Sequence, residues 1–274
     1  MSLWITSTSA ARDNPRVLRN RSGLGAFTLI ELLAVIAIVT VLSSLILSGV
    51  ISAKQKAGST RCKSNHRQFG LAFSLYAGDH DDAVLPNKDG QAVPLGETWV
   101  EGWAGIPGPD CTNVAFLKRS LLGPYITAAQ VWQCPSSGLP IVNGVKMARV
   151  RTISLNSFVG GEPQSKASTY RKVADFAKRS ASDIFTFVDE RPETVNDASF
   201  ALQRDFDEHS PFLWTLRDKP TVNHQLSATI SFADGHVGHQ LWVDARTHRP
   251  PRDDMILAGN LDILWLQQHG TTRP

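Results

Sequence analysis

The feature that most constrains this chain is an apolar run near its N-terminus. No charged residue occurs from Leu32 to Ala53. As an α-helix rising 1.5 Å per residue, such a run spans roughly 30 Å, the thickness of the hydrocarbon core of a bilayer. A core helix of a soluble protein would carry a polar face, and this run has none. We therefore expect residues 27–53 to form a transmembrane helix.

The charges that flank this run indicate which end stays in the cytoplasm. Residues 1–26 contain four arginines and one acid, which favours a cytoplasmic location for this segment. Basic residues also follow the run, from Lys54 onward, and they weaken the argument from charge. Four of the 28 basic residues and one of the 25 acidic residues lie in residues 1–26, so the rest of the chain is neutral. We therefore expect no nucleic-acid partner.

A single acid, Glu31, interrupts the start of the apolar segment. A secretory signal peptide has a shorter apolar region, of 7–15 residues, that ends at small residues. An ordinary single-pass anchor fits the length of the run, but it does not explain Glu31. A carboxylate in lipid costs about 2.5–3.5 kcal/mol on insertion scales, and such residues usually have a partner and a function. The segment therefore calls for an explanation beyond anchoring.

The surrounding residues Ala26-Phe27-Thr28-Leu29-Ile30-Glu31-Leu32-Leu33 resemble the processing site of type IV prepilins and type II secretion pseudopilins. The resemblance implies that a prepilin peptidase removes residues 1–26 as a basic leader, cleaving between Ala26 and Phe27, and methylates Phe27. Glu31 is then the fifth residue of the mature chain. It would pair with the N-terminal amine of a neighbouring subunit, which offsets the burial of both charges and fixes the axial register.

One position departs from the pattern of that family, which usually has glycine where Ala26 stands. Cleavage after Gly25 would place Glu31 at the sixth position, so we expect the cut after Ala26. The resemblance implies a single-pass protein of the bacterial inner membrane with a periplasmic C-terminal domain. Its partners would be the prepilin peptidase and other pilin or pseudopilin subunits.

Beyond the membrane, the sequence predicts that the helix continues over residues 54–78. Apolar residues recur four apart, as in Phe69 and Phe73 or Leu71 and Leu75, which is typical of an amphipathic helix. Gly78 and the acidic stretch after it mark its end. Residues 79–274 would then form the extracytoplasmic globular domain.

The C-terminal half changes to a β pattern. Alternating or β-branched runs at 153–159, 184–188, 228–233 and 236–243 predict strands. Asp234-Gly235 joins the last two runs and is a strong hairpin signal, because both residues of such a turn need positive φ. The fold class is therefore α+β and pilin-like, with a long N-terminal helix packed on an antiparallel sheet. Residues 260–269 predict a final helix capped by Asn260.

The hairpin carries a second resemblance. His224, nine residues and then Asp234-Gly235 are similar to the H-X9-DG signature of a prepilin-like group that is common in planctomycete and verrucomicrobial bacteria. Further pieces of the chain resemble the same group, so the likeness extends over nearly its whole length. These pieces are Leu121-Leu122-Gly123-Pro124-Tyr125, Cys134-Pro135, Ser154-Leu155-Asn156, Val188-Asp189-Glu190-Arg191-Pro192 and Ser231-Phe232-Ala233-Asp234-Gly235-His236. The group implies a pseudopilin-like subunit and supplies no activity.

Two kinds of chemical site can be considered from the residues. The residue types of His224 and Asp234 suit an acid–base pair or half of a metal site, but no nucleophile motif accompanies them, so we expect structural roles and no enzyme. We expect no cofactor, with calcium held by Asp189, Glu190 or Asp234 as the alternative. The cysteines Cys62, Cys111 and Cys134 lack a CxxC zinc pattern. They allow one disulfide, Cys111–Cys134 or Cys62–Cys134, or they are buried apolar residues.

Two functions from different classes follow. The first is a structural subunit, processed by prepilin peptidase, of a type II secretion pseudopilus or a type IV pilus. The alternative is a membrane-tethered module that binds a surface or a polysaccharide and uses the leader only for export. The clue to the alternative is the loop with Trp99 and Trp103, although packing of these rings onto the domain core is the simpler interpretation.

Overall fold

The structure is a computed structural model of the whole chain. It describes residues 27–90, 92–105, 108–138, 141–142, 145–146, 149–162, 169–249 and 256–272. The expected leader, with Ala26, lies outside the described residues. The chain divides into two compact units, Met1–Gly49 and Val50–Pro274, which are treated separately below.

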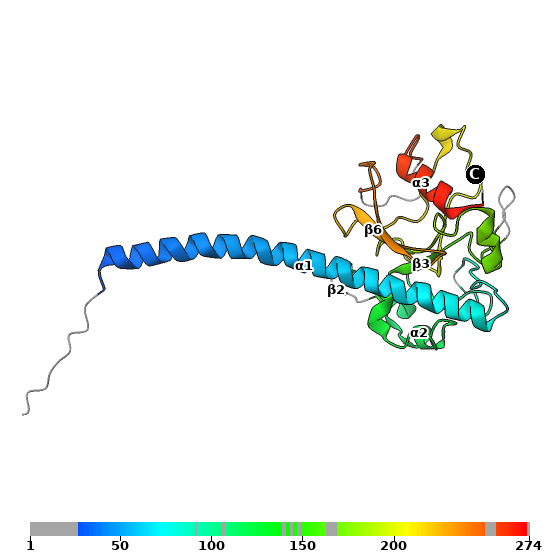
Figure 1. Cartoon of the computed structure of the whole chain (residues 1–274), viewed down its shortest axis with the longest axis horizontal. Helices are drawn as coiled ribbons and strands as arrows, with labels where there is room; N and C mark the ends of the chain where they lie inside the picture. Colours follow the sequence, from blue (N-terminus) through cyan, green and yellow to red (C-terminus); the bar gives the residue numbers. More distant parts are fainter. Residues whose placement is uncertain are drawn as a thin grey trace, which may run out of the picture. The chain divides into compact units, whose positions relative to one another are not determined.

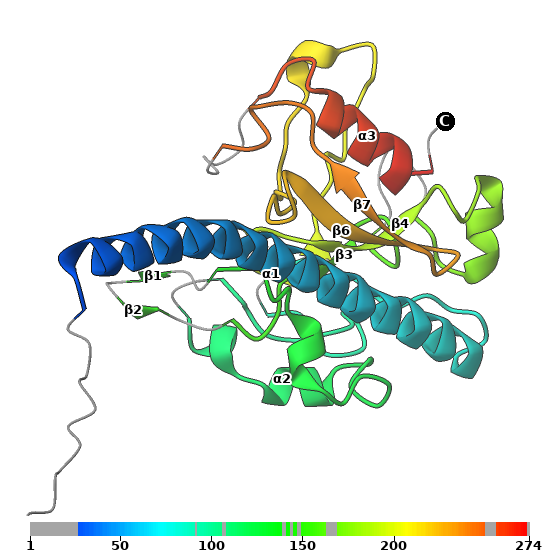
Figure 2. The same cartoon turned by 60° about the vertical axis from the view of Figure 1, so that its left-hand side comes forward.

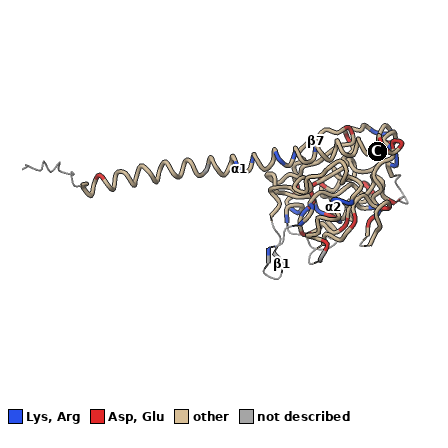
Figure 3. The backbone as a smooth tube through the Cα atoms, turned by 90° about the horizontal axis from the view of Figure 1, so that it is seen from below, with Lys and Arg blue, Asp and Glu red and all other residues tan. Residues whose placement is uncertain are grey.

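Apart from Phe27 and Thr28, the described part of the first unit belongs to the helix α1, which runs without a break from Leu29 to Asp79. Its tube carries no basic or acidic colour over the apolar run in Figure 3. The large apolar side chains from Phe27 to Ile51 are exposed to solvent in the isolated chain. Within the described ranges, α1 is the helix long and apolar enough to cross a membrane. The prediction of a long apolar N-terminal helix is thus confirmed, with bounds within two residues of those expected (Figure 1).

In the second unit, the remainder of α1 buries one face. Cys62, Phe69, Phe73 and Tyr76 are buried at intervals of three, four or seven residues, as one helix face requires. Leu71 points elsewhere and is 60% exposed, because two residues of helix turn the side chain through about 200° from Phe69. Of the two apolar repeats seen in the sequence, only the one through Phe69 and Phe73 therefore faces the domain.

The main sheet has five strands in the order β5-β3-β4-β6-β7. Neighbouring strands are antiparallel except for β5, which runs parallel to β3. The prediction of a purely antiparallel sheet was therefore wrong in this respect, and the sheet is mixed. The strands are β3 (Ile153–Asn156), β4 (Phe185–Asp189), β5 (Ser199–Phe200), β6 (Ser227–Phe232) and β7 (Val237–Leu241), and a separate hairpin joins β1 (Ile141–Val142) to β2 (Val145–Lys146).

Helices cover the two faces of this sheet. On one face, Phe69 of α1 packs against Phe187 of β4 with ring centroids 5.0 Å apart. On the other face, Trp265 of the last helix stacks on Phe185 at 6.4 Å. A register shift in β4 between Phe185 and Val188 accompanies this change of face, as a β-bulge does. Figure 2 shows α1 and α3 with the sheet between them.

The remaining helical elements are short, and the last helix is as predicted. Asn260 caps α3, because its side-chain oxygen accepts hydrogen bonds from the backbone N–H groups of Asp262 and Ile263. Residues 113–133 contain two short helical pieces, α2 and η2. The elements are η1 (Pro109–Thr112), α2 (Ala115–Arg119), η2 (Ala129–Trp132), η3 (Val173–Lys178), η4 (Pro211–Leu213) and α3 (Leu261–Gly270).

An aromatic cluster joins α1 to the rest of the domain. Phe69 meets Trp132 at 5.1 Å and Trp99 at 6.2 Å, both edge to face. Trp99 and Trp132 are stacked at 5.7 Å, and all three rings are fully buried. The prediction that Trp99 packs in the core is confirmed, so Trp99 is not part of a binding surface.

Candidate functional site

The first candidate site is the start of α1, where the side chains of Thr28 and Glu31 bind each other's backbone. The Thr28 backbone N–H and hydroxyl both donate to Glu31 Oε2, at 2.9 and 2.7 Å, and the Glu31 N–H points back to Thr28 Oγ1 at 3.3 Å. This reciprocal pair is a capping box. In the isolated chain, Glu31 therefore has a local structural role that the sequence analysis did not foresee.

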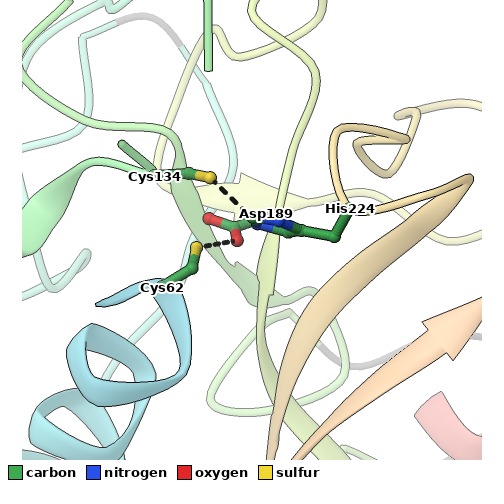
Figure 4. A group of neighbouring side chains, drawn as sticks. All are labelled: Cys62, Cys134, Asp189 and His224. Atoms are coloured by element: carbon green, nitrogen blue, oxygen red, sulfur yellow. Dashed lines mark hydrogen bonds between the residues drawn. The ribbon is translucent and has the colours of Figure 1, made fainter. Parts of the chain in front are cut away.

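The second candidate site brings together four residues from four segments of the second unit, and we call it the thiol–histidine cluster. One ligand atom from each residue lies within 4.8 Å of the corresponding atom of every other, and all four side chains are buried. Figure 4 shows the two sulfur atoms and the imidazole converging on the carboxylate. The members are Cys62 on α1, Cys134 after η2, Asp189 at the end of β4 and His224 before β6.

The contacts within the cluster are short. Cys62 Sγ donates to Asp189 Oδ2 at 2.8 Å, and Cys134 Sγ lies 3.2 Å from His224 Nε2. A fifth residue, His66, is one turn along α1 from Cys62, and its Nε2 lies 3.4 Å from Asp189 Oδ2. The other ring nitrogen of His66 lies 2.9 Å from Ser231 Oγ, which holds the ring in place.

The fold of each segment explains this convergence. Cys62 lies seven residues before Phe69, so both lie on the buried face of α1. The backbone N–H of Cys134 donates to Thr152 Oγ1, which fixes the segment after η2 beside β3. Gln225 and Leu226 both have positive φ, an uncommon conformation for such residues, and their tight turn places His224 at the start of β6.

The electrostatics of the cluster place negative charge on one sulfur. The neighbouring Cys62 thiol lowers the pKa of Cys134 to about 7 against the opposing effect of burial. The contact with Cys134, burial and the charge of Asp189 raise the pKa of Cys62. Burial acts to lower the pKa of His224, but the contact with Cys134 and the charge of Asp189 raise it overall. The cluster can therefore hold a thiolate–imidazolium pair or ligate a soft metal ion.

A cleft gives the cluster access to solvent. It has a volume of about 600 Å³ and is lined by the α1 residues around Ser59, by His224 and by His239 of β7. His239 Nε2 lies 2.6 Å from Ser59 Oγ, and its ring is 5.1 Å from that of His224. Burial, the charge of Lys63 and then His224 lower the pKa of His239 to about 4, so this ring is neutral at neutral pH.

The structure separates the other residues that the sequence singled out. His224 and Asp234 lie at opposite ends of β6, roughly 20 Å apart for a six-residue strand, so they form no acid–base pair. Asp234 accepts hydrogen bonds from the backbone N–H and the ring of His236 at the hairpin, at 3.0 and 2.6 Å. Only Gly235 of the Asp234-Gly235 pair has positive φ, so the expectation of two such residues was wrong.

The three acids proposed for calcium do not converge either. Asp189 belongs to the thiol–histidine cluster, whereas the carboxylate of Glu190 accepts from Ser154 Oγ at 2.6 Å. Burial raises the pKa of Glu190 well above its usual value. Asp234 is exposed at the far end of β6. Calcium prefers six to eight oxygen ligands, which this arrangement does not provide.

The cysteines are free thiols, and two of the three are neighbours. Cys62 and Cys134 meet in the cluster, as one of the two predicted disulfide pairs requires. Cys111 is outside the cluster, and its thiol donates to the backbone oxygen of Gly108 at 2.8 Å. The sequence analysis missed His66. Its position four residues after Cys62 and three before Phe69 places it on the same helix face, which is the signal that could have found it.

A third feature is a polar cleft of about 760 Å³ beside Trp103. Asp89, Asp197 and Arg204 are among its lining residues, and Arg204 pairs with Asp89 at 2.7 Å. Charged groups of both signs therefore surround this cleft.

Comparisons with protein-family models, with curated proteins and with solved structures find no match for this chain. Its function is therefore argued from its own residues and geometry.

Proposed function

We propose that this chain is a pilin-like structural subunit that is cleaved before Phe27 by a prepilin peptidase and assembled through α1. The observation that carries the proposal is the start of α1, where a run free of charge follows a single acid in the first turn. A charged carboxylate at the edge of an apolar helix is costly in lipid. Assembly gives this carboxylate a partner, because the N-terminal amine of a neighbouring subunit's Phe27 is a cation that would lie at a similar depth in the membrane.

The contacts of Glu31 are compatible with that second role. Both donors from Thr28 bind Oε2. In the proposed filament, Oε1 accepts the hydrogen bond from the neighbour's amine, so the capping box and the intersubunit pair coexist. A charge-assisted pair of this kind is short, directional and strong in an apolar surrounding, and it therefore sets the register between subunits.

The exposed side of α1 beyond Val50 supplies the proposed packing surface. Leu71 and Leu75 are one turn apart and are 60% and 48% exposed, whereas the opposite side of the helix is buried in its own domain. Exposed apolar residues in a row are typical of a contact surface. We infer that these leucines pack against the helix of a second copy or of another pilin-like subunit in the filament.

The experiment must separate assembly from local capping. In cells that hold the peptidase and the assembly machinery, Glu31→Gln keeps a side chain that can close a capping box but removes the charge. Thr28→Ala removes the hydroxyl of the box but keeps the charge. We expect Glu31→Gln to abolish incorporation into sheared filaments, with membrane insertion unchanged, and Thr28→Ala to assemble.

The opposite pattern would refute the proposal. If Glu31→Gln assembles as the unaltered chain does, the charge has no role in assembly and Glu31 is a helix cap. Mass spectrometry of the mature N-terminus gives the independent check. We expect a peptide beginning at N-methylated Phe27, and only in cells that contain the peptidase.

A second candidate is the membrane-tethered binding module, which the polar cleft beside Trp103 favours. Its volume of about 760 Å³ lies in the range of small-molecule sites, and its charged walls suit a polar ligand such as a saccharide. A module of this kind needs no assembly, so it would tolerate both substitutions at the start of α1, Glu31→Gln and Thr28→Ala. The same experiment therefore distinguishes the two functions.

A further inference from the structure

We propose that the thiol–histidine cluster binds one Zn²⁺ ion through all four of its side chains. The site would be structural, because four protein ligands close the coordination shell and leave no position for a substrate. The inference is independent of the proposed assembly function, since it rests only on the interior of the second unit.

The donor set is the first argument. Two cysteine sulfurs, one imidazole nitrogen and one carboxylate oxygen are the ligand types that Zn²⁺ takes in proteins. Calcium and magnesium ligate oxygen and are excluded by the sulfurs. Copper(I) favours thiolates and thioethers, and the carboxylate does not suit it.

The geometry is the second argument. Zn–S bonds of about 2.3 Å and Zn–N or Zn–O bonds of about 2.0–2.2 Å give a tetrahedron whose edges are roughly 3.3–3.8 Å. The four ligand atoms lie within 4.8 Å of one another. Cys62 Sγ is already 2.8 Å from Asp189 Oδ2, and Cys134 Sγ is 3.2 Å from His224 Nε2. The shift needed to surround an ion is therefore about 1 Å or less per atom, which rotation of the side chains supplies.

The buried carboxylate of Asp189 is the third argument. Asp189 is fully buried, and among the described residues its Oδ1 has no hydrogen-bond partner. A buried carboxylate without full compensation is costly. Zn²⁺ supplies a positive charge at the right place. A Cys62–Cys134 disulfide supplies none and removes the donor that now binds Oδ2.

His66 lies against the carboxylate of the cluster. Ser231 Oγ donates to the backbone oxygen of His66 at 3.1 Å, so it accepts from Nδ1 of the ring. With Nδ1 held in this way, Nε2 lies 3.4 Å from Asp189 Oδ2. His66 is thus a positioning residue that orients the carboxylate.

The route for the ion is also present. His224 lines the cleft of about 600 Å³ beside α1, and its Nε2 lies 3.2 Å from Cys134 Sγ in the cluster. The ion would enter past the imidazole. Because its ligands come from α1, the segment after η2, β4 and the loop before β6, it would fasten the helix to the sheet domain.

The test uses the full chain in detergent, loaded with ZnCl₂ and separated from free metal by gel filtration. Elemental analysis should find about one Zn²⁺ per chain, and Co²⁺ in its place should give the visible spectrum of a tetrahedral thiolate site. Cys134→Ser should lose the metal, whereas Cys111→Ser, the matched control at the third buried cysteine, should keep it. His66→Gln should keep the stoichiometry but bind Zn²⁺ about 10–100-fold more weakly.

Thiol counting in denaturant with EDTA identifies the competing outcomes. Three reactive thiols are expected after removal of the metal. One reactive thiol, with a mass two hydrogens lower in the fragment linking Cys62 and Cys134, would show a disulfide and overturn the proposal. Three thiols without metal binding, or another metal in preference to zinc, would overturn it too. The unaltered chain gives these results by itself, so the test does not depend on the folding of a variant.

Discussion

Truncation of Phe69 should remove a large part of the stability of the domain. This ring is fully buried and packs against Trp132 and Phe187 at 5.1 and 5.0 Å and against Trp99 at 6.2 Å. Removal of a buried phenylalanine costs about 3–5 kcal/mol in total, and the loss of three aromatic pairs, each worth about 0.5–1.5 kcal/mol beyond area burial, places Phe69 at the upper end of that range. We expect Phe69→Ala to lower the free energy of unfolding by about 4–5 kcal/mol.

Urea denaturation of the full chain in detergent, followed by tryptophan fluorescence, measures this loss. Phe69→Leu should lose about 1.5 kcal/mol and keep the protein folded if the alanine variant does not fold. Leu71→Ala is the matched control, because it truncates a large apolar residue on the exposed side of the same helix and should change stability by less than about 0.5 kcal/mol. If Phe69→Ala and Leu71→Ala were equal, α1 would not be part of the domain core, and the packing argument would be refuted.

Two further predictions concern single polar groups. Burial raises the pKa of Asp218 to about 7, so its contribution to stability is fully present below about pH 4 and is lost as the pH rises through about 7. Asp218→Asn should remove that pH dependence. At pH 8 the free energy of unfolding of the variant should exceed that of the unaltered chain by about 1–2 kcal/mol. A pKa raised by about three would correspond to roughly 4 kcal/mol, but the side chain is partly exposed, so the gain is smaller. A gain at pH 4 instead would contradict the direction of the pKa shift. Asn260→Ala removes the cap of α3 and a bond to Thr247, and it should cost about 1–3 kcal/mol in the same urea assay, with an unchanged midpoint as the contrary result.

The elements with a strong local signal could be predicted from the sequence. The apolar run before Ala53 and the repeat through Phe69 and Phe73 fix a long helix, and Asn260 before an apolar stretch fixes the start of α3. Asp234-Gly235 fixes the β6–β7 hairpin. In each case neighbours in sequence determine the structure, so the pattern is sufficient.

The mixed character of the sheet could not be predicted, because β5 is only two residues long. Ser199–Phe200 has no periodicity, and it joins the sheet through hydrogen bonds between the backbones of β5 and β3. The polar residues of β3 wrongly indicate that one face of this strand is exposed to solvent. Ser154 and Asn156 alternate with apolar residues, as in a strand with one wet face. Both are fully buried, with Ser154 bound to Glu190 and Asn156 bound to the backbone oxygens of Phe185 and Gly270.

The sequence likewise does not show that the members of the thiol–histidine cluster come together. The sequence marked all four as candidates, but for three different reasons: a disulfide for the cysteines, calcium for Asp189 and a motif for His224. Each lies in its own segment, and their spacing matches no metal pattern because the ligands come from a helix, a strand and two loops. Only the tertiary fold brings their ligand atoms within 4.8 Å of one another.

The two proposals meet in α1, which carries Glu31 in its first turn and Cys62 within the domain. A filament transmits load between the helix and the globular domain of each subunit, so the attachment between them must not open. Apolar packing around Phe69 resists this locally, but forced unfolding is governed by the unfolding rate rather than by equilibrium stability. A metal that ligates α1 and three separate segments adds a crosslink that must break before the helix can leave. If both proposals hold, loss of zinc should therefore increase the rate of unfolding of the domain even where the proposed register contact of Glu31 is intact.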